Sequence, residues 1–186
     1  MDDLFEWIIF VLASLAIVII SRRSLFKPRS HGFYRFFAWE CILALILINL
    51  DVWFREAGSW HQILSWVLLV ISFIPLGFGV RLLVRRGKPV DRREGQGELL
   101  GFEKTSTLVT DGIYHYIRHP LYSSLLFLAW GTFFKAPGWV GGLLLLGATL
   151  ALVATARADE AECTRFFGER YQEYMKRTKR FVPFIL

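Results

Sequence analysis

The sequence has few of the residues that hold disulfide-rich or zinc-binding domains together. It contains two cysteines, Cys41 inside an apolar run and Cys163 in a segment with helical periodicity. Two cysteines do not make a disulfide framework, and they have no zinc-site spacing. The sequence also shows no internal repeat, low-complexity tract or flexible linker. We therefore expect residues 1–186 to form a single domain.

Charged residues are scarce along much of the chain, and long apolar stretches take their place. Hydrophobic residues make up 54% of the sequence and aromatic residues 16%, and the mean hydropathy is +0.42. Soluble domains use fewer apolar residues and interrupt them more often. The composition therefore predicts a membrane protein.

The lengths of the apolar stretches predict the fold, because about 20 residues of helix cross a bilayer. Five stretches qualify or nearly qualify: about 4–20, 36–54, 60–84, 121–134 and 138–156. The first begins with acidic residues and has no cleavage site of small residues, so we interpret it as a span and not as a secretory signal. An amphipathic stripe over 159–178 predicts an interfacial helix, interrupted near Gly168. The expected fold class is an all-α polytopic membrane bundle of about five transmembrane helices with a C-terminal interfacial helix.

The basic residues predict how this bundle is oriented. Residues 21–35, 81–118 and 157–186 hold 20 of the 22 Lys and Arg residues, while Arg55 and Lys135 fall on the other side. By the positive-inside rule, the N-terminus is expected outside or in the lumen, and the C-terminus in the cytosol, of a bacterial inner membrane or endoplasmic reticulum. The net charge of +6 then belongs to the membrane surface. We predict no nucleic-acid partner, because no basic and aromatic binding module is present.

Candidate functional residues are concentrated in the segment GIYHYIRHPLYSS, residues 112–124. Pro120 suits the first turn of a helix whose free N–H groups attract anions. Arg118 offers a planar double donor to a carboxylate or phosphate, and His119 can change its charge near neutral pH. Both residues are equally well explained as ordinary flanking charges. His115 and His119 have the spacing of a metal pair, but the residue before a proline avoids the helical region, so we predict no metal site.

The apolar segment that follows this motif is short. Pro120 to Lys135 is 16 residues, or about 24 Å of helix against a hydrocarbon core of about 30 Å. One end is therefore expected to lie below the lipid surface. The polar loop 85–120, rich in glycine, precedes this end and is predicted to be a cytosolic cofactor loop.

Acidic residues are expected at the same membrane face, because they follow the end of the fifth stretch. Asp159 and Glu160 follow directly after the span 138–156. In such a place carboxylates are most often simply solvated, but beside Arg118 and His119 they can hold a cation or a zwitterion. Weaker candidates are ionisable or polar residues of the second stretch and two glycines of the third, where a ligand or a neighbouring helix can approach closely: Glu40, Asn49, Asp51, Gly77 and Gly79.

The two motifs together resemble a known family. GIYHYIRHPLYSS, followed by DEAECTRFFGERYQEYMKRTKRFVP at 159–183, is similar to the C-terminal half of the integral-membrane methyltransferases that include isoprenylcysteine carboxyl methyltransferase and the phospholipid N-methyltransferases. The resemblance implies S-adenosylmethionine as the cofactor, bound at the cytosolic face, and a lipid or lipophilic small molecule as the acceptor. It implies catalytic roles for Arg118, His119 and Glu160. The implied cofactor-binding residues are Gly77, Gly79, Gly112, Tyr114, Arg118, His119, Pro120, Tyr122, Asp159 and Glu160.

The sequence departs from this family at three positions, with Asp159, Ser124 and Cys163 where Glu, Gly and Leu are usual. Asp-Glu-x-x-Cys also resembles the membrane sterol reductases, which use a reduced nicotinamide cofactor but are much longer. We favour methyl transfer to an isoprenylcysteine-type carboxylate or a similar acceptor. A phospholipid amine or thiol acceptor, an NADPH-dependent reductase and a non-catalytic membrane scaffold are the alternatives.

Overall fold

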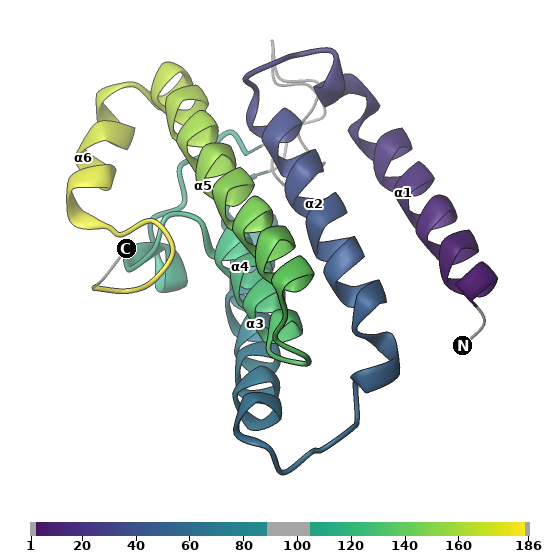
Figure 1. Ribbon diagram of the computed structural model, residues 1–186. Coiled ribbons are helices and arrows are strands. Elements are labelled where there is room, and N and C mark those ends of the chain that lie inside the picture. The colour runs from purple at the N-terminus through teal and green to yellow at the C-terminus, as the bar shows by residue number, and fades with distance from the viewer. Residues whose placement is uncertain (1–2, 89–104, 185–186) are drawn as a thin grey trace.

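The computed structural model describes residues 3–88 and 105–184, and these ranges are dominated by helices. Four helices are long: α1 (Asp3–Leu25), α2 (His31–Ile48), α3 (Trp60–Arg86) and α5 (Trp139–Phe167). The shorter α4 (Pro120–Phe133) lies among them, and α6 (Glu169–Arg177) lies outside the bundle (Figure 1). Two single turns, η1 (Leu50–Val52) and η3 (Gly112–His115), complete the regular structure of the described residues. The predicted all-α fold class is confirmed.

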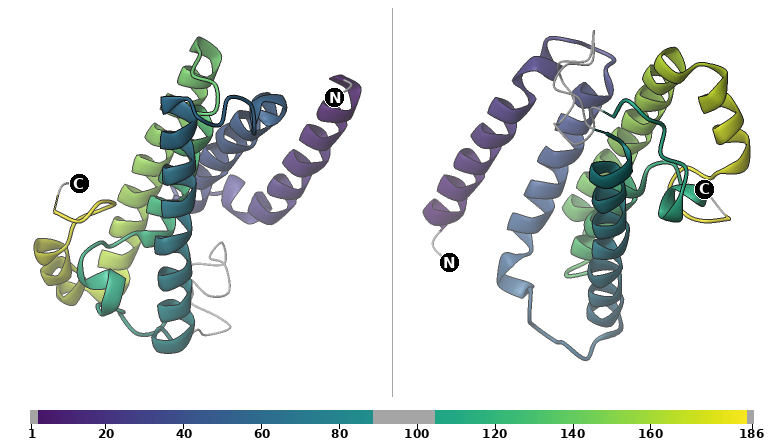
Figure 2. Two further views of the ribbon diagram at one scale, coloured as in Figure 1. Left: turned by 90° about the horizontal axis from the view of Figure 1, so that it is seen from below. Right: turned by 180° about the vertical axis from the view of Figure 1, so that it is seen from behind.

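The bundle is built on two tightly packed helix pairs, α2 with α5 and α3 with α4. Small residues line the first of these contacts, because Ala38, Ala148 and Ala156 are fully buried. Small side chains let helix backbones approach closely, which is how helices pack in membranes. Helices α1 and α6 lie at opposite edges of the bundle in every view (Figures 1 and 2).

Large apolar side chains cover the outside of the bundle, as expected of a membrane protein. Phe73 on α3 and Leu143 on α5 are each 70% exposed, and Leu12 on α1 is 62% exposed. Among the described residues, four helices are long and apolar enough to cross a bilayer: α1, α2, α3 and α5. The 14 residues of α4 reach only about 21 Å. The expected fifth crossing is therefore a helix, but one too short to traverse a bilayer of ordinary thickness.

The helix in the second stretch has other ends than the predicted 36–54, and capping residues set both of them. Helix α2 begins earlier, at His31, because the Ser30 hydroxyl accepts a hydrogen bond from the backbone N–H of Phe33 at 3.2 Å. It ends earlier, at Ile48, where the Asn49 side chain donates to the Leu45 carbonyl at 2.8 Å. Asn49 is thus a buried capping residue, and Asp51 lies exposed in η1.

The predicted boundary between the fifth span and the interfacial helix is wrong. Helix α5 does not stop near 156 but continues to Phe167, so Asp159 and Glu160 belong to α5 and not to a separate helix over 159–178. The chain breaks at Gly168, whose φ of +63° favours glycine. Helix α6 then runs only from Glu169 to Arg177. The predicted interruption near Gly168 is confirmed.

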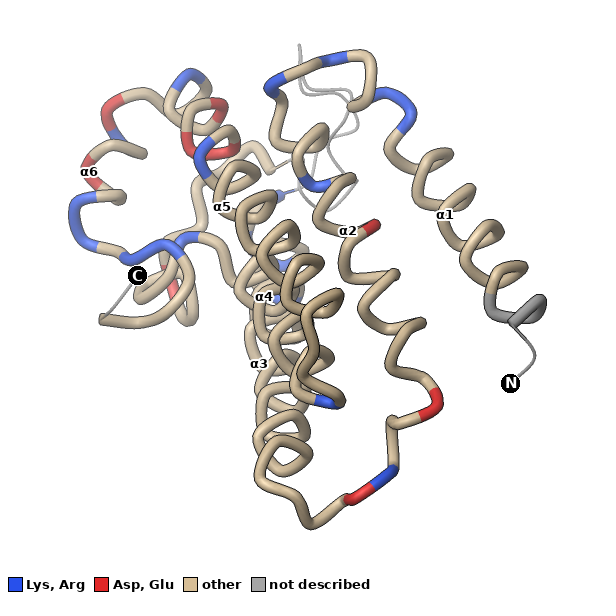
Figure 3. The backbone as a smooth tube through the Cα atoms, viewed as in Figure 1, with Lys and Arg blue, Asp and Glu red and all other residues tan. Residues whose placement is uncertain are grey.

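The basic residues gather toward one end of the bundle, around the α1–α2 connection, the end of α5 and α6 (Figure 3). At the opposite end, Lys135 is 1% exposed although it stands in a connecting turn. Its ammonium group donates to Gln62 at 3.0 Å and lies 3.6 Å from the centroid of the Trp66 ring. These contacts fasten the α4–α5 turn to α3.

The two glycines of α3 lie in different surroundings. A Cβ atom on Gly79 would lie 2.8 Å from Leu121 and 3.0 Å from Pro120, so this glycine allows α3 to approach the first turn of α4. A Cβ atom on Gly77 would meet nothing within 4 Å. Gly79 therefore has a packing role, and Gly77 lies on an open face.

We expect Gly79→Val to destabilise the bundle and Gly77→Val to leave it nearly unchanged. The added methyl groups at position 79 overpack the α3–α4 contact, which costs about 1–3 kcal/mol. The test is the midpoint of thermal unfolding of each purified variant in detergent. Both variants place the same branched residue in the same helix, so equal midpoints would contradict the packing role.

Candidate active site

The Arg118-His119-Pro120 segment is held in place by the C-terminal tail. The backbone N–H of Arg118 donates to the Lys179 carbonyl at 2.8 Å, and the N–H of Lys179 donates to the Tyr116 carbonyl at 3.0 Å. The N–H of His119 donates to the Arg180 carbonyl at 3.2 Å. Helix α4 begins at Pro120, as the sequence predicts. This short pairing brings residues about 60 positions apart in the sequence into one site.

The carboxylate of Glu160 binds two guanidinium groups. Arg118 approaches it through Nε at 3.0 Å and Nη2 at 2.9 Å, and Arg180 through Nε at 3.0 Å and Nη2 at 2.8 Å. Arg118 also donates through Nη1 to the carbonyl of Thr178. Glu160 is 8% exposed. Glu160 therefore ties α5, the start of α4 and the tail together.

His119 lies between the two acidic side chains. Its Nδ1 is 3.4 Å from Asp159 and its Nε2 is 3.4 Å from Glu160. The imidazole stacks on the Tyr122 ring at a centroid distance of 5.3 Å. Burial alone lowers the pKa of His119, but the contacts and charges of Asp159 and Glu160 outweigh burial, so its pKa is raised. The two carboxylates therefore favour the protonated form of this side chain.

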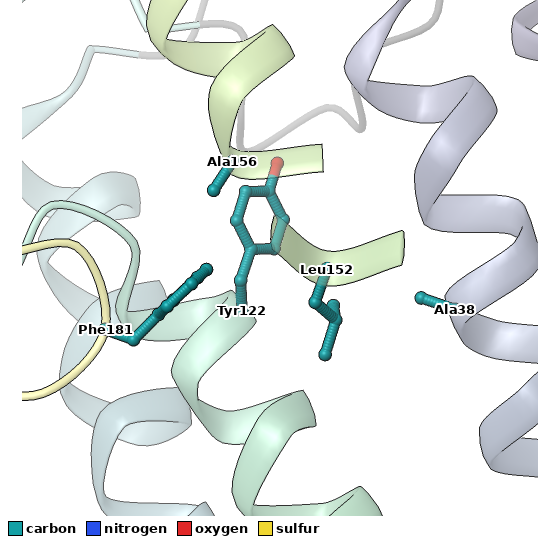
Figure 4. Close-up of a cluster of buried hydrophobic side chains, with 5 residues drawn as sticks. All are labelled: Ala38, Tyr122, Leu152, Ala156 and Phe181. Carbon is teal, nitrogen blue, oxygen red and sulfur yellow. The ribbon is translucent and has the colours of Figure 1, made fainter. Parts of the chain in front are cut away.

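Asp159 points in a different direction from Glu160, toward a pocket at the same end of the bundle. Its Oδ2 accepts from the Tyr122 hydroxyl at 3.2 Å, and its Oδ1 lies 3.4 Å from the Cys163 sulfur. Tyr122 itself packs near Ala156 and Phe181 (Figure 4). The space between the atoms of this pocket is about 760 Å³, which includes open solvent. Its lining comes from α3, the segment before α4, α4, α5 and α6. The lining residues are Leu83, Thr105, Leu108, Val109, Tyr114, Arg118, His119, Pro120, Leu121, Tyr122, Asp159, Glu162, Cys163, Phe167, Tyr171 and Tyr174.

Six of the ten predicted cofactor-binding residues line this pocket: Tyr114, Arg118, His119, Pro120, Tyr122 and Asp159. Four do not: Gly77, Gly79, Gly112 and Glu160. Gly112 has a φ of +57° and packs against Leu82, so it shapes the turn η3. Glu160 is turned toward the two arginines.

Several residues of the site were not predicted from the sequence. Glu162 lines the pocket and binds His31 at the start of α2, through the backbone N–H at 3.0 Å and Nδ1 at 2.7 Å. His31 is fully buried, and no local pattern links it to position 162. Phe167, Tyr171 and Tyr174 form an aromatic wall of the pocket. The sequence predicted them only as part of an amphipathic helical stripe. Within the predicted loop 85–120, Thr105, Leu108 and Val109 also contribute to the pocket, and residues 89–104 lie outside the described part of the chain.

The remaining candidates lie elsewhere. Glu40 on α2 accepts two contacts from the Ser14 hydroxyl of α1, at 3.0 and 2.9 Å, so it joins those helices. Across residues 3–88 and 105–184, no group of three or more His, Cys, Asp or Glu side chains is arranged to hold a metal ion.

Comparison with known proteins is informative over this same region. The phospholipid methyltransferase family profile matches residues 94–173. Protein-S-isoprenylcysteine O-methyltransferase of Schizosaccharomyces pombe is 37% identical over 84 residues, which cover 44% of this chain and 35% of the relative. The Xenopus laevis enzyme of the same name is 33% identical over 128 residues, covering 66% and 42%. Methanethiol S-methyltransferase of Pseudomonas deceptionensis is 25% identical over 151 residues, covering 73% and 51%.

These matches cover most of the pocket-forming part of the chain. Residues 94–173 are similar to the phospholipid methyltransferases, and the relatives described above are methyltransferases of isoprenylcysteine and of methanethiol. The chain spans between about a third and a half of the length of these relatives.

We expect His119 to stabilise the protein in a pH-dependent manner. A group whose pKa is raised by folding contributes fully below its ordinary pKa of about 6.5, and the contribution is lost as the pH rises through the raised pKa. The unfolding temperature of the wild type should therefore exceed that of His119→Gln most at pH about 6, and the difference should shrink toward pH about 9. Thermal unfolding across this range provides the test.

The matched control is His115→Gln, which makes the same change at an exposed position. A difference between wild type and His119→Gln that stays constant with pH would contradict the raised pKa of His119.

Proposed function

We propose that this protein transfers a methyl group from S-adenosylmethionine to a lipophilic acceptor, an isoprenylcysteine-type carboxylate or a similar group, at the cytosolic membrane face. The observation that carries the proposal is the meeting of Asp159, His119 and Tyr122 at the wall of one pocket. All three residues lie inside the stretch that matches the phospholipid methyltransferase family. The relatives' names support an acceptor carrying an oxygen or sulfur nucleophile.

The side chains of the pocket fit the proposed cofactor. Asp159 and Glu162 provide carboxylates for its positively charged sulfonium and amino groups, and Phe167, Tyr171 and Tyr174 provide aromatic surface for its adenine. When bound, S-adenosylmethionine supplies a methyl group on a positively charged sulfur, and the sulfur keeps the electron pair when an acceptor atom takes the methyl.

The two neighbouring acids are assigned different roles in this proposal. Asp159 faces the pocket and contacts the cofactor, whereas Glu160 holds Arg118 and Arg180 and is a positioning residue. His119 lies between the two carboxylates, and their negative charges favour its protonated form. Glu160 is therefore a poor candidate for a general base, because its carboxylate is committed to two guanidinium groups.

A carboxylate or thiolate acceptor needs no base. The protein's contribution is then to orient the two reactants and to exclude water, which strengthens the electrostatic interactions in the pocket. Leu83, Leu108, Val109 and Leu121 provide the apolar part of the pocket lining. The acceptor's tail would remain in the bilayer while its reactive group reaches the pocket from the side.

The distribution of basic residues along the bundle supports a cytosolic site. Basic segments gather at the end that carries the pocket (Figure 3). The positive-inside rule then assigns this end to the cytosol and the N-terminus to the outside or lumen.

A small thiol is the second candidate acceptor. The methanethiol S-methyltransferase matches over the largest share of this chain among the three relatives described, 73%. A thiol that is neutral in solution must lose its proton, and the carboxylates of the pocket lining that are candidates to receive it are Asp159 and Glu162.

We expect S-adenosylmethionine and S-adenosylhomocysteine to raise the unfolding temperature of the detergent-purified protein, because each stabilises the folded state by binding to it. NADPH should produce no comparable shift. Stabilisation by NADPH alone would favour the reductase, and the absence of any shift would favour a non-catalytic scaffold.

We expect Asp159→Asn and Glu160→Gln to have different effects. Asp159→Asn removes a charged contact with the cofactor, which costs about 1.5–3 kcal/mol, or about 10- to 100-fold in affinity for S-adenosylhomocysteine. Glu160→Gln leaves two guanidinium groups without a carboxylate, so it should lower stability by about 3 kcal/mol. Calorimetric titration measures the affinity and thermal unfolding measures the stability.

The two substitutions serve as each other's control, because they are isosteric and adjacent. An unchanged affinity of Asp159→Asn for S-adenosylhomocysteine would contradict the proposed contact between Asp159 and the cofactor. An unchanged stability in Glu160→Gln would show that the arginine pair does not hold the tail.

A further inference from the structure

A second pocket lies beside the first, on the outer side of the C-terminal tail, and its lining is strongly basic. The residues that line it are Arg118, Met175, Lys176, Arg177, Thr178, Lys179 and Arg180. Five of these seven side chains carry a positive charge, and none carries a negative charge. We call this pocket the tail basic site.

Acidic partners account for only part of this charge. Arg118 and Arg180 bind Glu160, and Lys176 binds Glu173 at 2.6 Å. Arg177 and Lys179 are exposed, and within the described ranges their side chains have no hydrogen-bond or ion-pair partner. Glu173 offsets part of the charge of Arg177, but the lining of the pocket keeps an excess of positive charge. An anion would relieve the mutual repulsion of these cations.

The depth of the tail basic site favours a lipid as the source of this anion. Lys179 pairs through its backbone with Tyr116 and Arg118, just before Pro120, where the apolar helix α4 begins. The site therefore lies level with the N-terminal end of α4, where we expect the hydrocarbon core of the bilayer to begin. Cations at this depth lie near lipid phosphates and not in bulk solvent.

Exposed aromatic residues lie on the same stretch of backbone. Phe184 is 82% exposed and Tyr116 is 51% exposed, and their rings are 6.3 Å apart. Aromatic side chains next to cations are typical of surfaces that contact the boundary between headgroups and acyl chains. A free phosphate ion would gain nothing from these rings.

We propose that the tail basic site binds the phosphate group of an anionic phospholipid from the leaflet that faces the pocket, with Arg177 and Lys179 as its direct ligands. Phe184 and Tyr116 lie beside the glycerol and the first acyl carbons. The bound lipid stabilises the tail that carries Arg180, and so it supports the wall of the neighbouring pocket. The binding does not depend on methyl transfer.

The test compares lipids added to the full-length protein in detergent micelles. Phosphatidylglycerol is expected to raise the unfolding temperature and to remain bound in native mass spectrometry, whereas phosphatidylcholine and sodium phosphate are not. Replacing both ligands, Arg177→Gln with Lys179→Gln, should weaken phosphatidylglycerol binding about thirtyfold, since each surface cation contributes about a fivefold change. Phe184→Ser should weaken it as well.

The matched control is the double variant Arg22→Gln with Arg23→Gln. It removes two exposed cations from the end of α1 and should leave phosphatidylglycerol binding unchanged. The proposal is overturned if the double variant of the tail binds phosphatidylglycerol like the wild type, or if the control loses as much. Full stabilisation by sodium phosphate, or none by phosphatidylglycerol, would overturn the lipid assignment.

Discussion

The pocket end of the molecule depends on one buried carboxylate. Glu160 receives Arg118 from the segment before α4 and Arg180 from the tail, so three chain segments meet at a single charge. A buried carboxylate is costly unless its charge and its hydrogen-bonding capacity are both satisfied, and two guanidinium groups satisfy both. The ion pairs of Glu160 also position an apolar side chain, because Phe181 follows Arg180 directly and is buried beside Tyr122 and Leu152 (Figure 4).

This arrangement explains how two adjacent acids can serve different purposes. Successive residues of a helix point about 100° apart, so when Glu160 faces the arginines, Asp159 faces Tyr122, Cys163 and the pocket. His119 lies within 3.4 Å of both and connects them. A single helical turn of α5 therefore supplies both the structural anchor and the polar wall of the pocket. Under the proposed function, substitutions of these two acids must be interpreted separately.

Apolar stretch lengths were sufficient to predict the fold class, because the bilayer sets the length of a helix that crosses it. Helix ends were less predictable, since Ser30 and Asn49 act through local hydrogen bonds that apolar patterns do not record. The motif at 112–124 and the acids at 159–160 were identified as candidates, but their partners were not. Arg180 and the His31–Glu162 pair are joined to the site by tertiary contacts between residues far apart in sequence, and no spacing rule connects them. For Glu160, the sequence predicted a catalytic and cofactor-binding role, and the structure adds that its carboxylate pairs with Arg118 and Arg180.

The unequal lengths of α4 and α5 give the pocket its position relative to the membrane. The 14 residues of α4 extend about 21 Å, whereas the 29 residues of α5 extend about 43 Å, against a hydrocarbon core of about 30 Å. Helix α5 must therefore project beyond the lipid on at least one side, and its charged end, from Arg157 onward, is the end that cannot remain in hydrocarbon. The pocket lies between this projecting wall and the start of α4. In the proposed reaction, such a site would admit a water-soluble nucleotide from above and a membrane-bound acceptor from the side, because neither reactant would have to leave its own solvent.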